Sequence, residues 1–132
     1  MEKIMVDTSA IYALLDKSDD MHNQAKKILF MLAEEKATVM ITNFIVAECH
    51  ALLASRLNPG LARNWLENLS WPVERITDED EIKALNIIVH YEDKAFSYTD
   101  AATFAVMERL GINKVFAFDR HFAQYGFLLY GV

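Results

Sequence analysis

Four carboxylates occupy positions from which they could hold a divalent metal ion together. Asp7 and Asp119 each follow a short apolar run, and Glu48 and Asp100 lie early in predicted helices among apolar or small residues. Because burying an unpaired carboxylate is costly, acids in such surroundings need a partner. Oxygen ligands favour Mg²⁺ or Mn²⁺ over zinc. Hydrolysis of phosphodiester bonds is a reaction that such a site can catalyse.

Each of these acids also has an ordinary structural explanation. Asp7 could cap the first helix, and Asp119 could cap a short helix that follows it. Asp100 could stabilise a helix N-terminus, and Glu48 could pair with Arg56. A shared function is favoured because the predicted elements bring all four acids to one edge of one sheet.

The elements that would position the acids alternate between strands and helices. Apolar runs predict buried strands over 3–6, 38–41, 73–76, 114–118 and 127–130. Helical spacing and capping residues predict helices over 8–15, 19–36, 43–57, 61–69, 78–91, 98–110 and 120–124, with a turn at 58–60. Thr8 or Ser9 is the expected cap of the first helix.

This alternation predicts an α/β fold with three α/β/α layers around a mainly parallel sheet of about five strands. Ligand sites in such sheets lie beyond the carboxyl ends of the strands, where the strand order switches. Asp7 and Asp119 directly follow predicted strands, so the rule places them at that edge.

The composition limits the classes of protein to which this chain can belong. The chain has 132 residues, 53% of them hydrophobic, without repeats or linkers, which predicts one domain over 1–132. Its net charge of −6 argues against a passive nucleic-acid-binding module. It argues less against a metal-dependent nuclease, because bound cations reverse the local charge.

Features of secreted and membrane proteins are not expected. A single cysteine, Cys49, cannot form an internal disulfide. The N-terminal stretch does not have the pattern of a signal peptide, and no apolar run is long enough to cross a membrane. The predicted location is the cytoplasm, without a membrane partner.

Several motifs together resemble those of PIN domains. They are Val6-Asp7-Thr8-Ser9, the N-x-x-x-x-E pattern from Asn43 to Glu48, the segment Phe96 to Ala101, and the segment Ala117 to Phe122. In order, spacing and chain length the sequence is similar to the VapC type, the toxins of bacterial and archaeal toxin–antitoxin pairs. The resemblance implies a PIN-like fold, an acidic pocket for Mg²⁺ or Mn²⁺, and endonucleolytic cleavage of RNA. It also implies a homodimer and neutralisation by a cognate antitoxin.

The resemblance also implies roles for individual residues. Asp7, Asp100 and Asp119 are expected to bind the metal directly or through water. Glu48 is the fourth acid of the catalytic and metal-binding set, and it is expected to orient water. Supporting roles are expected for Thr8 and Ser97. Independently of the resemblance, Arg120 could contact a phosphate of the substrate, and the alternative is a solvated surface charge.

One position departs from the family pattern. Many relatives have Thr or Ser two residues before the last acid, where this chain has Ala117, so one hydroxyl is missing. His121 lies in the same motif, and we expect it to orient the Asp119 loop.

Other functions fit the sequence less well. A phosphatase of the haloacid dehalogenase type needs a second Asp two residues after the first, and that residue is Ser9. A receiver domain needs an acidic pair before its acceptor strand, which has no clear counterpart here. Two related alternatives stay open, namely a solitary PIN-domain RNA-processing nuclease and a catalytically inactive PIN-fold binding module.

Overall fold

The apolar runs of the sequence form one five-stranded sheet in the computed structural model, which describes residues 2–130. The strands are β1 (Lys3–Val6), β2 (Thr38–Thr42), β3 (Val73–Glu74), β4 (Lys114–Phe116) and β5 (Leu128–Leu129). The helices are α1 (Thr8–Leu15), α2 (His22–Glu34), α3 (Asn43–Arg56), α4 (Pro59–Glu67), α5 (Asp78–His90), α6 (Tyr98–Leu110) and α7 (His121–Tyr125).

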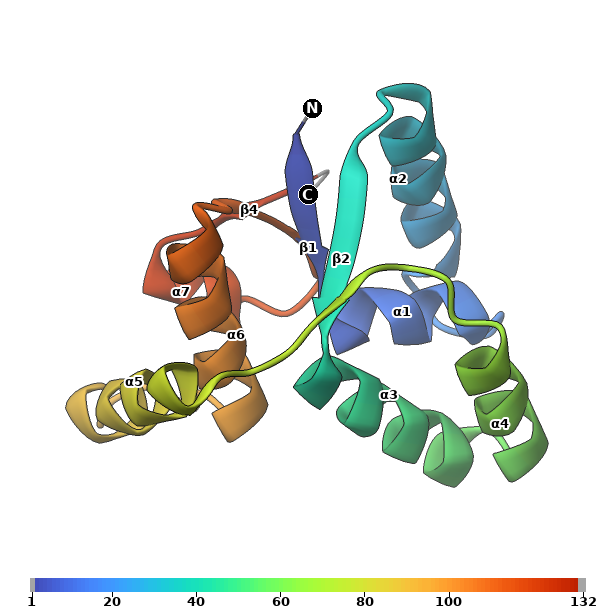
Figure 1. Ribbon diagram of the computed structural model, residues 1–132. Coiled ribbons are helices and arrows are strands. Elements are labelled where there is room, and N and C mark those ends of the chain that lie inside the picture. Colours follow the sequence, from blue (N-terminus) through green and yellow to red (C-terminus); the bar gives the residue numbers. More distant parts are fainter. Residues whose placement is uncertain (1, 131–132) are drawn as a thin grey trace.

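The strand order is β3-β2-β1-β4-β5, and every described pairing is parallel. The chain therefore winds outward from β1 to β3 and then returns to place β4 on the other side of β1. This reversal between β1 and β4 is the switch point at which such sheets bind ligands. Figure 1 shows β1 and β2 ending at the same edge, where α1 and α3 begin.

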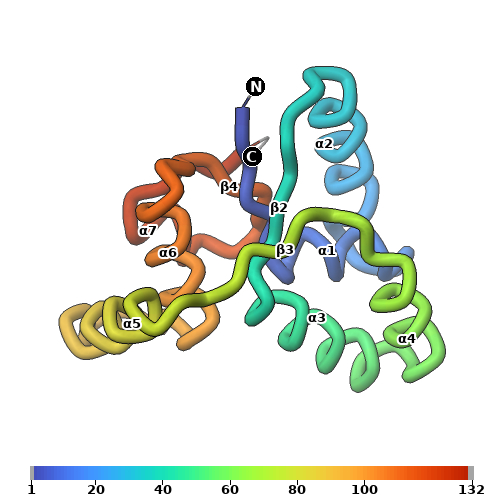
Figure 2. Tube along the Cα trace, in the orientation of Figure 1, coloured from blue at the N-terminus to red at the C-terminus, as the bar shows by residue number. Residues whose placement is uncertain are grey.

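Helices lie on both sides of the sheet, which confirms the predicted α/β/α layers. Helix α2 lies to one side of β1 and β2, and α6 and α7 lie to the other (Figure 1). The segment with β3 crosses between α4 and α5, which lie on opposite sides (Figure 2). Phe104, Phe116 and Phe122 are completely buried in the core between α6, β4 and α7.

Helix α6 is the most deeply buried helix of the described chain, with every residue from Asp100 to Met107 buried. Ser97 caps its N-terminus, and the helix ends at Gly111, whose φ of 70° is in the left-handed region that glycine adopts without strain. Since the helix is fixed at both ends and along its length, Asp100 in its first turn has a defined position.

Several predicted boundaries differ from the structure. Helix α2 begins at His22 instead of residue 19, because the Asp19 carboxylate accepts a hydrogen bond from the Met21 amide, 2.8 Å away, in a turn. Helix α4 begins at Pro59, where a turn was predicted. Asn58 caps it by accepting a bond from the Leu61 amide at 2.7 Å, and Pro59 takes the first helical position.

Two strands are shorter than predicted. Strand β3 ends at Glu74 instead of residue 76, and β4 ends at Phe116 instead of residue 118. Beyond the strands, the Ile76 amide donates to the Asn43 side chain at 2.8 Å and the Phe118 amide to the Ser9 hydroxyl at 3.0 Å, so side chains replace the neighbouring strand as partners. No helix within residues 2–130 is both long and apolar enough to span a bilayer.

Candidate active site

Asp7 lies directly beyond the central strand β1 and is buried, with 3% of its surface exposed. Its Oδ2 accepts hydrogen bonds from the Ser9 amide at 3.2 Å and the Ser9 hydroxyl at 2.8 Å. Asp7 is therefore the cap of α1, and the prediction of Thr8 or Ser9 as the cap is wrong. The reason is that Asp7 keeps the extended backbone of the strand (φ −89°, ψ 161°), from which its carboxylate reaches the first turn.

Asp100 enters the site from the first turn of α6 and is 6% exposed. It forms a capping box with Ser97, whose amide donates to Asp100 Oδ2 at 3.0 Å and whose hydroxyl accepts from the Asp100 amide at 2.9 Å. The same Oδ2 lies 2.7 Å from His121 Nδ1. Within residues 2–130, these bonds leave Oδ1 of Asp100 without a protein partner, so it can bind a ligand.

Asp119 lies in the loop between β4 and α7 and is half-buried. Its Oδ1 accepts a hydrogen bond from the His121 amide at 3.0 Å. Ligand atoms of Asp100, Asp119 and His121 all lie within 4.8 Å of one another, which is close enough for one metal ion. His121 was expected only to orient the loop. The structure makes it a direct neighbour of two of the predicted acids.

Two hydroxyls lie beside these acids. The Ser9 hydroxyl donates to Asp7 and accepts from the Phe118 amide at 3.0 Å, so it joins the end of β1 to the loop after β4. Thr8 is buried, and its Oγ1 is the one buried side-chain oxygen in residues 2–130 without a hydrogen-bond partner. An unpaired buried hydroxyl is costly, which makes Thr8 an unusual feature of this edge of the sheet. Ala117 is completely buried.

The carboxylates destabilise one another electrostatically. Burial raises the pKa of Asp7 well above its usual value, and the negative charges of Asp119 and Asp100 raise it further. The hydrogen bonds from Ser9 oppose this rise without cancelling it. A divalent cation among the carboxylates would remove the repulsion. Oxygen donors, together with the free Thr8 hydroxyl, therefore fit a divalent metal.

Glu48 approaches the same site from α3. A cleft of about 460 Å³ opens above the acids, and Glu48 lines it together with Asp7, Thr8 and Asp119. No ion pair joins Glu48 to Arg56 in the described part of the chain, although Arg56 also lines this cleft. The sequence alternative in which Arg56 neutralises Glu48 is therefore not what the structure shows.

The remaining candidates lie at the edge of the site or outside it. Ser97 is exposed and acts through Asp100. Arg120 is exposed and is not among the residues that line the cleft. Cys49 is buried beside Glu48, and burial with the nearby negative charges raises the pKa of its thiol to about 12, so it is not an activated nucleophile.

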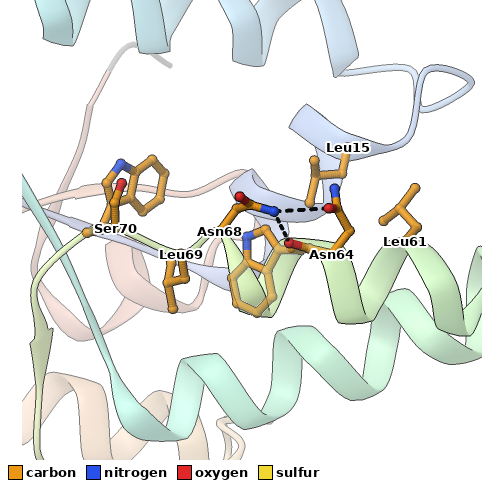
Figure 3. A pocket seen from close by; sticks show the side chains of 8 residues that line it. Leu15, Leu61, Asn64, Asn68, Leu69 and Ser70 are labelled. Carbon is orange, nitrogen blue, oxygen red and sulfur yellow. Dashed lines mark hydrogen bonds between the residues drawn. The ribbon is translucent and has the colours of Figure 1, made fainter.

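A second feature is an apolar groove between α1, α2 and α4. Two adjoining cavities of about 290 and 490 Å³ share Leu15, Trp65 and Trp71. Figure 3 shows Leu15, Leu61 and Leu69 around Asn64 and Asn68. The Asn68 side-chain amide donates to the Asn64 backbone carbonyl at 2.9 Å and to the Asn64 side-chain oxygen at 3.0 Å. Lys17, His22 and Lys26 contribute to the other end of this groove.

Comparisons with known proteins agree with the fold. Residues 4–128 match the PIN domain family. The chain is 34% identical over 128 residues to the 23S rRNA-specific endonuclease VapC20 of Mycobacterium tuberculosis, covering 95% of each chain. The crystal structure of VapC20, a sarcin–ricin-loop-cleaving toxin, has a TM-score of 0.85 at 33% identity and covers 95% of this chain and 96% of that chain.

More distant structures share the fold alone. FitAcB from Neisseria gonorrhoeae has a TM-score of 0.73 at 17% identity, covering 96% of both chains. A toxin–antitoxin complex from Klebsiella pneumoniae has a TM-score of 0.61 at 14% identity, covering 89% of this chain and 87% of that chain. The chain therefore belongs to the PIN-domain family and, within it, to the VapC-type toxin endoribonucleases, as its motifs predicted.

The strained carboxylate cluster predicts an effect on stability. Below its usual pKa, Asp7 is protonated in the folded and unfolded states alike. As pH rises from the usual pKa to the raised folded pKa, the folded state loses stability, and above that range the loss is complete. Asn keeps the oxygen that caps α1 but carries no charge. Asp7→Asn should therefore raise the free energy of unfolding at pH 7 in EDTA by about 1 kcal/mol or more, since one pKa unit corresponds to about 1.4 kcal/mol.

Urea unfolding of both proteins at pH 4 and pH 7 measures this effect. The difference should shrink at pH 4, and millimolar Mn²⁺ should stabilise the wild type more than the variant. A variant less stable than the wild type at pH 7 in EDTA would contradict the electrostatic account.

Proposed function

We propose that this endoribonuclease uses Mg²⁺ or Mn²⁺ to cut the sarcin–ricin loop of 23S rRNA and that a cognate antitoxin restrains it. The metal dependence rests on one observation, the convergence of Asp7, Asp100 and Asp119 at the switch point of the sheet. The substrate is inferred from VapC20, which is similar along 95% of the chain. A hairpin loop suits an open cleft, since unpaired bases and an accessible backbone are what proteins recognise in RNA.

Asp7, Asp100 and Asp119 would hold the metal ion. When bound, the ion lowers the pKa of water and neutralises charge that develops on the scissile phosphate. Ser97 fixes Asp100 through the capping box, and His121 orients the same carboxylate from the other side.

Glu48 faces this group from the cleft wall and is proposed to orient the attacking water. The water oxygen forms a bond to phosphorus, the bond to the leaving ribose oxygen breaks, and the proton that the water loses is balanced by the one that the leaving oxygen takes up. The Thr8 hydroxyl can donate to a phosphate oxygen or to a ligand carboxylate. Arg120, exposed in the loop after Asp119, is a proposed contact to the RNA backbone.

We also propose that the chain acts as one domain over 1–132 in the cytoplasm. A single buried core that includes β1, α3, α6 and α7 supports one folding unit. Retention of all four acids favours an active enzyme over a PIN-fold binding module.

Removing either buried acid should abolish cleavage. Asp7→Asn and Asp100→Asn should each reduce the cleavage rate of a synthetic sarcin–ricin hairpin by roughly 10³-fold, because each removes charge that the metal needs. Electrophoresis of end-labelled RNA measures the rate in Mg²⁺. The control is Asp93→Asn, an exposed acid paired only with Lys94, which should cleave like the wild type. Full activity in either active-site variant, after EDTA treatment and restored Mg²⁺, would refute the assignment.

The apolar groove between α1, α2 and α4 is the proposed site of the antitoxin. Trp65, Trp71 and Leu29 offer a surface for large apolar side chains, while Lys17 and Lys26 favour acidic neighbours in the bound segment. An antitoxin segment with apolar anchors and flanking acids is complementary to both features.

Groove variants should weaken antitoxin binding. The probe is the cognate antitoxin, to be sought in a small reading frame beside the gene for this chain, and isothermal calorimetry measures its affinity. Trp71→Ala should weaken binding by roughly 30-fold, as expected for a buried aromatic anchor. Lys26→Glu should weaken it through charge reversal. Lys27→Glu is the matched control, since Lys27 lies on the same helix and does not line the groove. Equal losses for the two lysine variants would argue against this surface.

Homodimerisation is proposed through the outer face of α5. Ile82, Leu85 and Val89 are 63%, 58% and 64% exposed, respectively, and their spacing places them on one face of the helix. A stripe of exposed aliphatic side chains marks an interaction surface, and a second copy of the chain can cover it symmetrically.

Charges on this face should separate the dimer. Ile82→Glu combined with Leu85→Glu should halve the mass measured by light scattering, because two carboxylates would be buried unpaired at the interface. The fold should survive, since both residues are exposed. Phe30→Glu on α2, where Phe30 is 65% exposed, serves as the control and should leave the mass unchanged. A double variant that keeps the wild-type mass would exclude this interface.

A further inference from the structure

We propose that Arg56 binds a phosphate of the RNA further along the strand from the scissile phosphate, and that Tyr12 holds the Arg56 side chain in place. The inference rests on the proposed function, because it concerns RNA bound in the same cleft. It assigns a substrate contact that the motifs do not indicate, at the end of α3 instead of the loop after β4.

The charges in the cleft point to this role. Four acids line it, namely Asp7, Asp19, Glu48 and Asp119. Arg56 is the one basic residue among the described residues that line it. A metal ion at the acid cluster neutralises charge around the scissile phosphate only. A phosphate further along the RNA strand would lie close to the other acids of the cleft. Arg56 can supply the positive charge that this phosphate needs.

Arg56 is exposed and forms no ion pair within residues 2–130. The two acids near Tyr12 accept hydrogen bonds from groups other than Arg56. Asp16 accepts from the Tyr12 hydroxyl at 2.7 Å and from the Ser18 amide and hydroxyl at 3.0 and 2.6 Å. Asp19 accepts from the Met21 amide at 2.8 Å. The Arg56 guanidinium is therefore left with its donors free.

Tyr12 determines where this guanidinium lies. The guanidinium carbon of Arg56 is 5.7 Å from the centre of the Tyr12 ring, within the range of a cation–π interaction. The bond from the Tyr12 hydroxyl to Asp16 fixes the ring. A cation–π contact leaves the N–H donors of arginine available, and their forked geometry matches phosphate oxygens. The pair is thus prearranged for an anionic ligand.

The spacing along α3 indicates which phosphate Arg56 would reach. Glu48, Leu52 and Arg56 line the cleft at intervals of one helical turn. Arg56 is eight residues beyond Glu48, which corresponds to about 12 Å along the helix axis. A phosphate at Arg56 is therefore one further along the same strand and not the scissile phosphate itself.

Binding measurements test this inference directly. The probe is a fluorescein-labelled sarcin–ricin hairpin, and the Asp100→Asn background in Mg²⁺ prevents cleavage during the titration. Arg56→Gln should weaken binding by roughly tenfold, the size expected for one lost charge-assisted contact. It should also reduce the slope of log Kd against log salt by about 0.7, as for the loss of one contact to a single-stranded phosphate.

Two further variants separate a phosphate contact from a general charge effect. Arg63→Gln makes the same change in net charge at an exposed position on α4 that does not line the cleft, so affinity and slope should stay near those of the parent. Arg56→Lys keeps the charge without the forked donors, so it should keep the salt slope and lose part of the affinity. Circular dichroism confirms that each variant is folded.

The outcomes distinguish this inference from the proposed function. If the wild type neither cuts nor binds the hairpin, the proposed function fails and this inference falls with it. If the wild type cuts the hairpin while Arg56→Gln binds with the affinity and salt slope of Arg63→Gln, only the role of Arg56 is overturned.

Discussion

The parallel pairing of β1 with β4 is the constraint on which the site depends. Met5 pairs with Val115 and Val6 with Phe116, so both strands end at one edge of the sheet. The Asp7 amide donates to the Phe116 carbonyl at 3.0 Å, and the Ser9 hydroxyl then ties the following loop to α1. Asp7 and the Asp119 loop are therefore brought together by backbone pairing. The carboxylates do not assemble themselves, because their charges repel.

The pairing of β1 with β4 also keeps negatively charged side chains close together in buried surroundings, an arrangement that folded chains otherwise avoid. The buried Asp7 remains close to Asp119 and Asp100 at the expense of a strongly raised pKa. The surrounding core, with α6 buried from Asp100 to Met107, is what holds this unfavourable geometry. Functional sites commonly retain such local instability, since the binding of a ligand relieves it.

Helix α1 lies between the acidic cleft and the apolar groove. Tyr12 lines the acidic cleft, whereas Ile11, Leu14 and Leu15 line the apolar groove. One short helix, capped by Asp7 itself, therefore connects the proposed metal site to the proposed antitoxin surface. The exposed face of α5 lies on the other side of the molecule, packed through its inner face on α6 (Figure 1). The three surfaces can thus act without overlapping.

The sequence by itself determined the α/β class, the approximate positions of the strands and helices, and the place of Asp7 directly after β1. These follow from apolar runs and local hydrogen bonding, which depend on near neighbours in the chain. Only the tertiary structure decided that His121 contacts Asp100, that Ser9 joins Phe118, and that Arg56 faces Tyr12 instead of Glu48. The first two contacts join residues that are 21 and 109 positions apart in the chain. The third depends on which of several residues along one wall of the cleft lies nearest to Arg56. Such choices depend on how helices pack against the sheet edge, and no local pattern encodes that geometry.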